Sequence, residues 1–280
     1  MLNRRARNYN GRRCIGVTVE DVRVSDWNQL NRELFESTWN ETIRRFRSNF
    51  VYRGMGNASA DLRTGLMKLG GNIREVEFHV LRNFKKYARQ DAVREQSEWN
   101  WLAVAQHHGV PTRLLDWSYS PYVALHFATV ELDRYERDGI IWCVNYVAVH
   151  KLLPRALRDV LSEERSNAFT VEMLERAAGS LLALEKLSKE DFAVFLEPPS
   201  LDQRIVNQFS IFAMMSSPLA RFDEWLLKEH GDLLRRIIIP AELKWEVRDK
   251  LDQANITERV LFPGLDGLAR WLQRHYTPRI

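Results

Sequence analysis

Apolar residues recur at helical spacing in several parts of the chain. In residues 25–46, five large apolar side chains share one helical face: Trp27, Leu30, Leu34, Ile43 and Phe46. Apolar residues three or four positions apart are typical of an amphipathic helix, so this spacing predicts a helix over 25–46. The same reasoning predicts helices at 74–96, 99–106, 171–187, 224–230, 242–252 and 266–275.

Short apolar runs between polar and turn residues predict strands at 50–52, 140–147, 192–196, 210–215 and 234–239. These strands do not alternate regularly with helices, as they would in a parallel sheet with crossover helices. No repeat, low-complexity tract or Pro/Gly/Ser-rich linker divides the chain. The pattern therefore predicts one α+β domain, with a sheet flanked by helices.

Composition narrows the class of protein. A chain of 280 residues that is 45% hydrophobic is long enough to bury a large core. Its two cysteines, Cys14 and Cys143, cannot build a disulfide framework, and no Cys/His spacing matches a structural zinc site. No apolar run is long enough for a signal peptide or a membrane span. We therefore expect a soluble, cytoplasmic protein without a metal and without a membrane partner.

Basic residues gather in two groups in the amino-terminal half. Five arginines precede the first acidic residue: Arg4, Arg5, Arg7, Arg12 and Arg13. The predicted helix at 74–96 carries the second group, which consists of Arg82, Lys85, Lys86, Arg89 and Arg94. Such groups can neutralise phosphates and so suggest nucleic acid as a partner, although a solvated surface is the more usual explanation of each group taken alone.

The segment 106–120 carries more hydrogen-bonding side chains than a simple connector needs. Ser120 followed by Pro121 predicts a helix start, because serine accepts a bond from a free amide and proline has none to lose. The remaining free amides of that helix would lie beside residues 116–118 and favour an anion such as phosphate.

Several known motifs are missing from the sequence. It has no P-loop, no HExxH and no GxSxG, and Gly54-Met55-Gly56 lacks the third glycine of a dinucleotide fingerprint. The two glycines still permit a positive φ or a close approach of a ligand to the backbone. His107 and His108 would point about 100° apart on a helix, so they are poor joint ligands for a metal.

Four motifs distributed along the chain resemble those of the FRG domain family. They are Tyr52-Arg53-Gly54, the segment from Gln106 to Trp117 with Ser120-Pro121, Arg204 with Gln208-Phe209-Ser210, and Leu261-Phe262-Pro263-Gly264. The resemblance extends over about 49–276, with tyrosine in place of the phenylalanine of the first motif. It implies a basic arm and lead-in at 1–24, followed by an FRG domain with a carboxy-terminal closing segment at 25–280.

The order of the FRG motifs resembles that of the ADP-ribosyltransferases. This resemblance implies an ADP-ribosyltransferase-like core of mixed and antiparallel strands, with NAD as a substrate and no metal. FRG domains occur in bacterial and phage proteins, often in toxin or defence settings, which implies an antitoxin or a defence-system protein as a partner.

The arginine–serine–glutamate class of transferases supplies the residue roles. In that class a strand carries an arginine, a second strand carries serines, and an acidic residue begins a third strand. The corresponding positions are Arg53, Ser118 beside Asp116, and Gln208, so the resemblance implies Arg53, Asp116 and Gln208 as catalytic residues. The residues that it implies for NAD binding are Tyr52, Gly54, Gln106, His107, Thr112, Arg113, Trp117, Ser118 and Arg204.

The third motif departs from the transferase pattern because Gln208 stands where a glutamate is expected. Glutamine can bind a ribose hydroxyl, but it cannot stabilise a cation by charge or accept a proton. Either Asp116 or Glu197 supplies that charge, or turnover is lost. The sequence thus favours an NAD-dependent ADP-ribosyltransferase that modifies nucleic acid, and the alternative is an inactive nucleotide- or nucleic-acid-binding module.

The candidate residues also have structural interpretations. Arg53 can pair with a buried carboxylate, Trp117 can lie in the core, and Asp116 can cap a turn.

Overall fold

A mixed sheet forms the centre of the molecule. The computed structural model describes residues 19, 21–88 and 97–279, and these residues form a seven-stranded sheet in the order β1-β9-β6-β4-β5-β8-β7. The strands are β1 (Asp21–Arg23), β4 (Phe50–Met55), β5 (Leu115–Ser118), β6 (Gly139–Asn145), β7 (Ala193–Leu196), β8 (Ser210–Met215) and β9 (Leu234–Ile239). β1 is parallel to β9, and the other neighbours are antiparallel. The fold is therefore α+β, as the sequence predicts.

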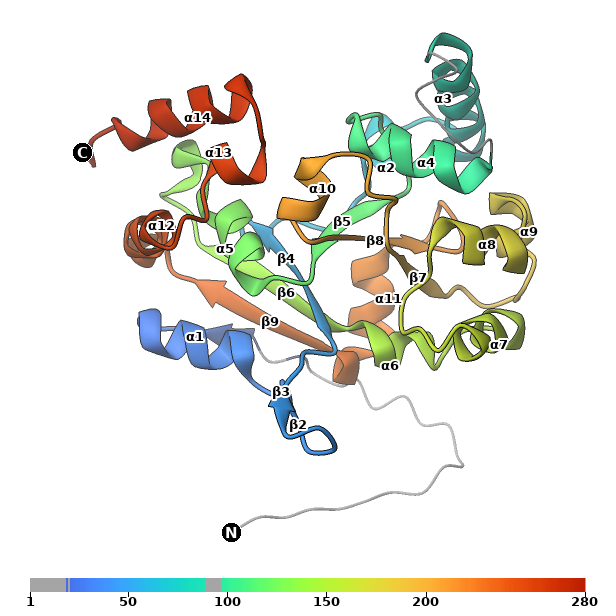
Figure 1. Ribbon diagram of the computed structural model, residues 1–280, viewed down its shortest axis with the longest axis horizontal. Helices are drawn as coiled ribbons and strands as arrows, with labels where there is room; N and C mark the ends of the chain where they lie inside the picture. Colours follow the sequence, from blue (N-terminus) through green and yellow to red (C-terminus); the bar gives the residue numbers. More distant parts are fainter. Residues whose placement is uncertain (1–18, 20, 89–96, 280) are drawn as a thin grey trace.

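Helices surround this sheet (Figure 1). They are α1 (Trp27–Phe35), α2 (Gly65–Leu69), α3 (Ile73–Tyr87), α4 (Glu98–His107), α5 (Pro121–Thr129), α6 (Tyr146–His150), α7 (Arg155–Glu163), α8 (Val171–Ala177), α9 (Leu181–Glu185), α10 (Gln203–Asn207), α11 (Phe222–Glu229), α12 (Lys244–Gln253), α13 (Glu258–Leu261) and α14 (Leu265–His275). Short 3-10 turns in the described part of the chain are η2 (Leu132–Arg134), η3 (Gly231–Leu233) and η4 (Ala241–Leu243).

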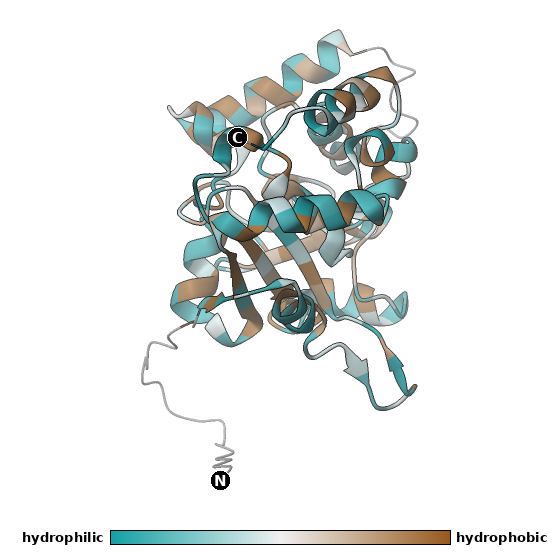
Figure 2. Cartoon of the chain, turned by 90° about the vertical axis from the view of Figure 1, so that its left-hand side faces the viewer, coloured by the Kyte–Doolittle hydropathy of each residue, from teal (hydrophilic) through white to brown (hydrophobic). Residues whose placement is uncertain are grey.

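The two faces of the sheet bury different helices. Helices α1, α5 and α12 pack against β4, β6 and β9 in one apolar cluster. On the opposite face, α11 packs against β5, β7 and β8 in a second cluster. Figure 2 shows the strands as the hydrophobic centre beneath helices whose outer faces are hydrophilic. The central strands β4, β6 and β9 thus contribute side chains to apolar clusters on both faces of the sheet.

The predicted helix at 25–46 is wrong beyond Phe35. The chain reverses at Ser37, whose φ is 60°, and continues as a short hairpin of β2 (Trp39–Asn40) and β3 (Arg45–Phe46). The rings of Trp39 and Phe46 meet edge to face across this hairpin with centroids 5.0 Å apart. Of the two apolar residues that suggested a continuing helix, Ile43 lies in the turn of the hairpin and Phe46 pairs with Trp39.

The other predicted elements differ mainly at their ends. β8 and β9 have the predicted bounds, whereas the predicted helix at 171–187 is interrupted between α8 and α9, where Ser180 caps the second helix. β1 belongs to the sheet, so residues 21–23 of the predicted lead-in are structural. The arginines of the amino-terminal arm, with Arg89 and Arg94, lie outside the described residues.

A buried ion-pair network fixes the carboxy-terminal helices. Arg274 on α14 donates to both Asp252 on α12 and Glu258 on α13. Arg248 on α12 pairs with Asp252 at 3.1 Å and donates to the ring of His126 on α5 at 2.9 Å. These contacts hold α13 and α14 beside the end of α5.

Candidate functional site

A cleft opens where two central strands separate. β4 pairs with β6 along its whole length, but its described residues pair with β5 only at Tyr52 and Ser118. Beyond that pair the strands diverge and leave a cleft of about 320 Å³, which is bordered by β4, β5, α5 and residues 56–63. This volume lies within the range of small-molecule sites.

Arg53 lies at the point of separation. Its Nη1 donates to the backbone carbonyl of Asp116, so the guanidinium occupies a β5 oxygen that β4 does not pair. Its Nε is buried and has no hydrogen-bond partner among the described residues. Burial lowers the pKa of Arg53, and the nearby Asp116 acts in the opposite direction. Arg53 therefore brings a positive charge to the cleft while bridging its two strands.

Asp116 projects into the cleft and is oriented from α4. Its side chain is exposed, whereas its strand neighbours Leu115 and Trp117 are buried in the core. The Nε2 of Gln106 lies 3.1 and 3.0 Å from the two carboxylate oxygens of Asp116. The hydroxyl of Thr112 donates in turn to the Oε1 of Gln106 at 2.5 Å. This chain of bonds fixes the carboxylate without neutralising it, because glutamine carries no charge.

The third motif lies on the other side of β5. The hydroxyl of Ser118 donates to the backbone carbonyl of Gln208 at 2.7 Å, which ties β5 to the residues just before β8. The Nε2 of Gln208 donates to the carbonyl of Leu261 at 2.9 Å. Gln208 lines the cleft, so the carboxy-terminal segment holds one of its walls.

Arg204 and His107 meet at the same wall. Arg204 lines the cleft, and its guanidinium lies 5.0 Å from the ring centre of Phe262. The Nε2 of His107 lies 2.8 Å from the carboxylate of Asp202, which caps α10. His107 thus positions α10, the helix that carries Arg204, and does not itself line the cleft.

Positive charge predominates in the cleft. Its charged lining consists of Arg53, Arg63, Lys68, Arg134 and Arg204 with Asp61, Asp116 and Glu131. Arg63 is paired with Asp61 at 2.8 Å, and Arg134 with Glu131 at 2.6 Å. Within the described part of the chain, Lys68 and Arg204 form no salt bridge. The cleft therefore offers an anionic ligand two cations that no described carboxylate neutralises.

A buried lysine supports one rim of the cleft. The Nζ of Lys244 donates to the carbonyls of Gly56 at 2.8 Å and Arg134 at 2.7 Å, both of which belong to cleft-lining residues. The side chain is fully buried, and burial lowers the pKa of Lys244 to about 8. It joins the end of β4 to η2.

Three of the residues implied for NAD binding have side chains that make contacts inside the fold. The hydroxyl of Tyr52 donates to Leu34 of α1 at 3.1 Å, and burial raises its pKa to about 12. Arg113 is buried and forms a salt bridge with Glu77 on α3. Trp117 contacts Phe195 and Phe222 edge to face in the core. Tyr52 and Trp117 nevertheless line the cleft, and the indole nitrogen of Trp117 has no hydrogen-bond partner among the described residues. Of these three residues, Arg113 is the one that does not line the cleft.

Gly54 allows a helix, rather than a ligand, to approach the backbone. A Cβ at this position would lie 1.7 Å from the carbonyl oxygen of Ala124 in α5. The same residue borders the cleft, so the helix and the cleft share this strand. The predicted start of α5 is confirmed, since Ser120 accepts from the amide of Val123.

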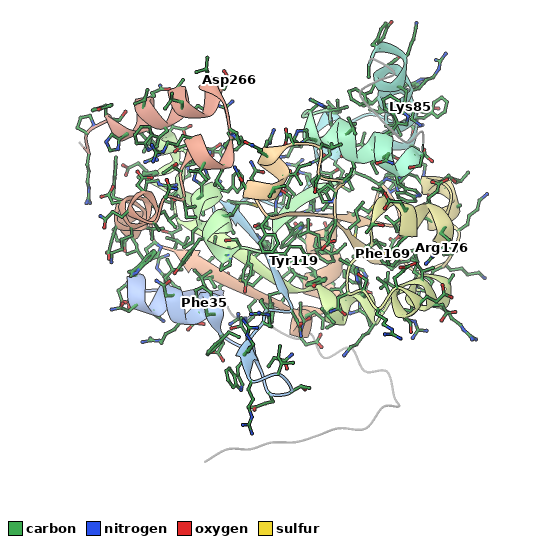
Figure 3. The ribbon with its side chains drawn as sticks, viewed as in Figure 1. Phe35, Lys85, Tyr119, Phe169, Arg176 and Asp266 are labelled. Atoms are coloured by element: carbon green, nitrogen blue, oxygen red, sulfur yellow. The ribbon has the colours of Figure 1, made fainter. Side chains whose placement is uncertain are left out.

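Two cleft-lining cations, Lys68 and Arg134, are not among the residues that the sequence suggested, and Glu197, which it offered as an alternative acid, lies outside the cleft. Lys68 and Arg134 come from α2 and η2, elements too short for their periodicity to show. Glu197, the alternative acid, accepts from the hydroxyl of Tyr119 at 2.8 Å and does not line the cleft. Figure 3 labels Tyr119, which follows the last residue of β5. Asp116 is therefore the carboxylate available on this strand.

Comparison with known proteins supports a family for part of the chain. Residues 48–137 match the model of the FRG domain, whereas no curated protein and no solved structure matches the chain. Among the described residues, no helix has the length and apolar character needed to cross a membrane, and no His, Cys, Asp and Glu side chains are grouped to hold a metal ion. The chain thus carries an FRG domain at residues 48–137, and this domain includes β4, β5 and α5, the elements that border the cleft.

Proposed function

We propose that this protein is an NAD-dependent ADP-ribosyltransferase that modifies nucleic acid. The observation that carries the proposal is the convergence of three separate motifs at one cleft. Arg53 on β4, Asp116 on β5 and Gln208 before β8 all line it, although they are distant in the sequence. Their order and their neighbouring strands agree with the motif order of the arginine–serine–glutamate transferases.

The charges of the cleft suit the diphosphate of NAD. Lys68, Arg204 and the guanidinium of Arg53 lie along the cleft and have no side-chain carboxylate in a salt bridge among the described residues. Charge-assisted bonds to phosphate are among the stronger polar contacts in proteins. We assign these three residues to the diphosphate, which anchors the substrate while the ribose reaches the carboxylate.

Asp116 is the group that we assign to the chemical step. Cleavage of the bond between nicotinamide and ribose develops positive charge on the ribose, and an oriented carboxylate stabilises that charge. A nucleophilic oxygen or nitrogen of the acceptor then bonds to the ribose C1′, nicotinamide leaves with the electrons of the broken bond, and the acceptor proton passes to Asp116 or to water. Gln106 and Thr112 act as positioning residues because they hold the carboxylate.

Gln208 then has a binding role. Its amide nitrogen is used by the carbonyl of Leu261, so its carbonyl oxygen stays available to accept from a ribose hydroxyl. The negative charge that glutamate would supply from this position comes from Asp116 on the adjacent strand. This division of roles accounts for a transferase with glutamine in the third motif.

The acceptor and the setting rest on the sequence. The two basic groups in the amino-terminal half favour nucleic acid, and a toxin or phage-defence role in the cytoplasm, restrained by an antitoxin or a defence-system partner, fits an FRG domain.

The test uses NAD labelled on its adenylate part, which is incubated with separate pools of single-stranded DNA, duplex DNA, RNA and protein. Nicotinamide release and label transfer are both followed. We expect release together with label on a nucleic-acid pool. Label on protein alone would contradict the acceptor, and the absence of release with every pool would contradict the enzyme.

One observation favours the alternative function. Gln208 is uncharged, so a module that binds NAD or nucleic acid without cleaving it remains the rival. The rival predicts saturable binding of NAD, measured by calorimetry, with no nicotinamide release from the same folded sample.

A further inference from the structure

Helix α3 presents a basic and aromatic face that the cleft does not use. Its outer side carries His79, Arg82 and Lys86, which lie three and four residues apart and therefore share one face. Phe78 is 65% exposed and Tyr87 is 76% exposed, so aromatic rings lie at both ends of this row. We call this surface the α3 face.

The charge of the α3 face is uncompensated. Arg82, Lys85 and Lys86 form no salt bridge among the described residues, and Lys86 lies 5.0 Å from the ring centre of Tyr87. The helix has acidic side chains at Glu75 and Glu77, but Glu75 lies in its first turn and Glu77 pairs inward with Arg113. From residue 78 to 87 the helix has no acidic side chain.

The body of the protein holds this helix rigidly on its inner side. Glu77 and Arg113 form a buried salt bridge, and Arg74 donates to Glu185 on α9 at 2.6 Å. Phe84 contacts Trp101 of α4 edge to face. The α3 face is therefore presented by a fixed helix at the periphery of the molecule, where Figure 3 labels Lys85.

The α3 face is connected to the cleft through α2. Lys68 lines the cleft from the last turn of α2, and Gly70 and Gly71, both with φ near 70°, reverse the chain into α3. Figure 1 shows α2 and α3 beside each other, and they are in contact. The first turn of α3 thus follows directly on the rim that carries Lys68, and the α3 face continues from it along the same helix.

We propose that the α3 face binds single-stranded nucleic acid and presents it to the cleft. The lysines and Arg82 suit phosphates, and the exposed rings of Phe78 and Tyr87 suit unstacked bases, a combination typical of single-strand binding. An acidic protein would use the charges but not the rings. This proposal rests on the proposed function, because the bound strand would be the nucleic-acid acceptor of the ADP-ribosyl group.

The test measures binding of a fluorescein-labelled single-stranded oligonucleotide to the full chain by fluorescence anisotropy at several salt concentrations. The test variant is Arg82→Ala/Lys85→Ala/Lys86→Ala. The control variant, Lys151→Ala/Arg155→Ala/Arg158→Ala, removes the same charge from exposed residues at and before α7. A third variant, Phe78→Ala/Tyr87→Ala, tests stacking.

We expect the α3 variant to bind about 10-fold or more weakly, with the salt slope reduced by about 2, because each lost phosphate contact removes about 0.7 from the slope. The stacking variant should weaken binding about 5-fold or more with little change in slope. The control variant should bind like the unmodified chain. Binding by the α3 variant equal to that of the control would overturn the proposal, as would displacement of the strand by polyglutamate as efficient as by unlabelled oligonucleotide.

Nicotinamide release without an acceptor separates this proposal from the proposed function. The α3 variant should release nicotinamide at the unmodified rate because the cleft is intact. Weakened strand binding in a protein that never releases nicotinamide would support the α3 face and contradict the transferase. If the α3 variant transferred label to nucleic acid as well as the unmodified chain does, the transferase would be supported and the α3 face contradicted.

Discussion

Individual side chains around the cleft differ in whether their hydrogen bonds are already used. The guanidinium of Arg113 donates to Glu77 and to the carbonyl of Ser216, both inside the fold. Asp116 lies three residues further along the chain and projects into the cleft, where it contacts an uncharged amide. Within this one motif, Arg113 is paired with a buried charge and is structural, whereas Asp116 has an uncharged partner and keeps its charge for a ligand.

Arg113→Met should lower the free energy of unfolding by about 3–5 kcal/mol, because it leaves Glu77 buried without its partner. Urea denaturation measures the change. Arg63→Met is the control, since the exposed pair of Arg63 with Asp61 should contribute no more than about 1 kcal/mol. If Arg113→Met left stability unchanged and instead raised the KM for NAD, Arg113 would be a binding residue.

The sequence predicted part of the candidate site at this scale. Arg53, Asp116, Ser118, Gln208 and Arg204 do line one cleft. Residue type alone could not show that Trp117 faces the core while Asp116 faces the cleft, because that depends on which side of β5 is buried.

Among the elements, the contact between α5 and β4 sets the shape of the cleft. The helix approaches the strand so closely that the carbonyl of Ala124 fills the space where Gly54 would carry a Cβ. β4 then cannot carry a side chain toward this helix at position 54, and the strand continues to Met55 along the cleft. A glycine in the FRG motif is thus explained by helix packing.

Gly54→Ala should destabilise the protein by at least about 3 kcal/mol, because the added Cβ meets backbone that no side-chain rotation can move. Thermal and urea denaturation measure it. Gly179→Ala is the matched control, since its Cβ would make ordinary contacts 3.6 Å and further away. A stable Gly54→Ala protein would show that α5 does not pack on β4 in this way.

Periodicity located most elements but not their pairing. It placed β8 and β9 correctly because each contains a short apolar run that is buried, Ile211–Met215 in β8 and Ile237–Ile239 in β9. It extended α1 through residues that form the β2–β3 hairpin, since paired apolar side chains on a hairpin can mimic helical spacing over one or two turns. The single pairing of β4 with β5 depends on tertiary contacts, so no local pattern could predict the cleft.

For the molecule as a whole, burial of neutral histidines makes stability depend on pH. His150 is bonded to the carbonyl of Asn167 and to the amide of Phe195, and burial lowers its pKa to about 4. His126 is enclosed between α5 and Arg248, and burial followed by that charge lowers its pKa to about 3. Both rings are thus neutral in the fold near neutral pH.

The free energy of unfolding should fall as the pH is lowered from about 6.5 to about 4, because in this range the unfolded chain binds protons that the buried rings do not. His150→Gln preserves a donor for Asn167 and an acceptor for Phe195 but does not titrate. It should reduce the slope by up to about 1.4 kcal/mol per pH unit. If the free energy of unfolding, measured by urea titration at each pH, had the same pH dependence in both proteins, a neutral His150 would be contradicted.

We propose that Asp116, in the cleft between β4 and β5, carries the cleavage of NAD. The most direct test is nicotinamide release by the purified chain, by Asp116→Asn, and by Asp232→Asn as a control on an exposed carboxylate in η3. We predict release by the unmodified chain and the control, and a rate about 10²-fold lower or less for Asp116→Asn at an unchanged melting temperature. Equal rates for all three, or no release from the folded chain with any acceptor pool, would contradict the account.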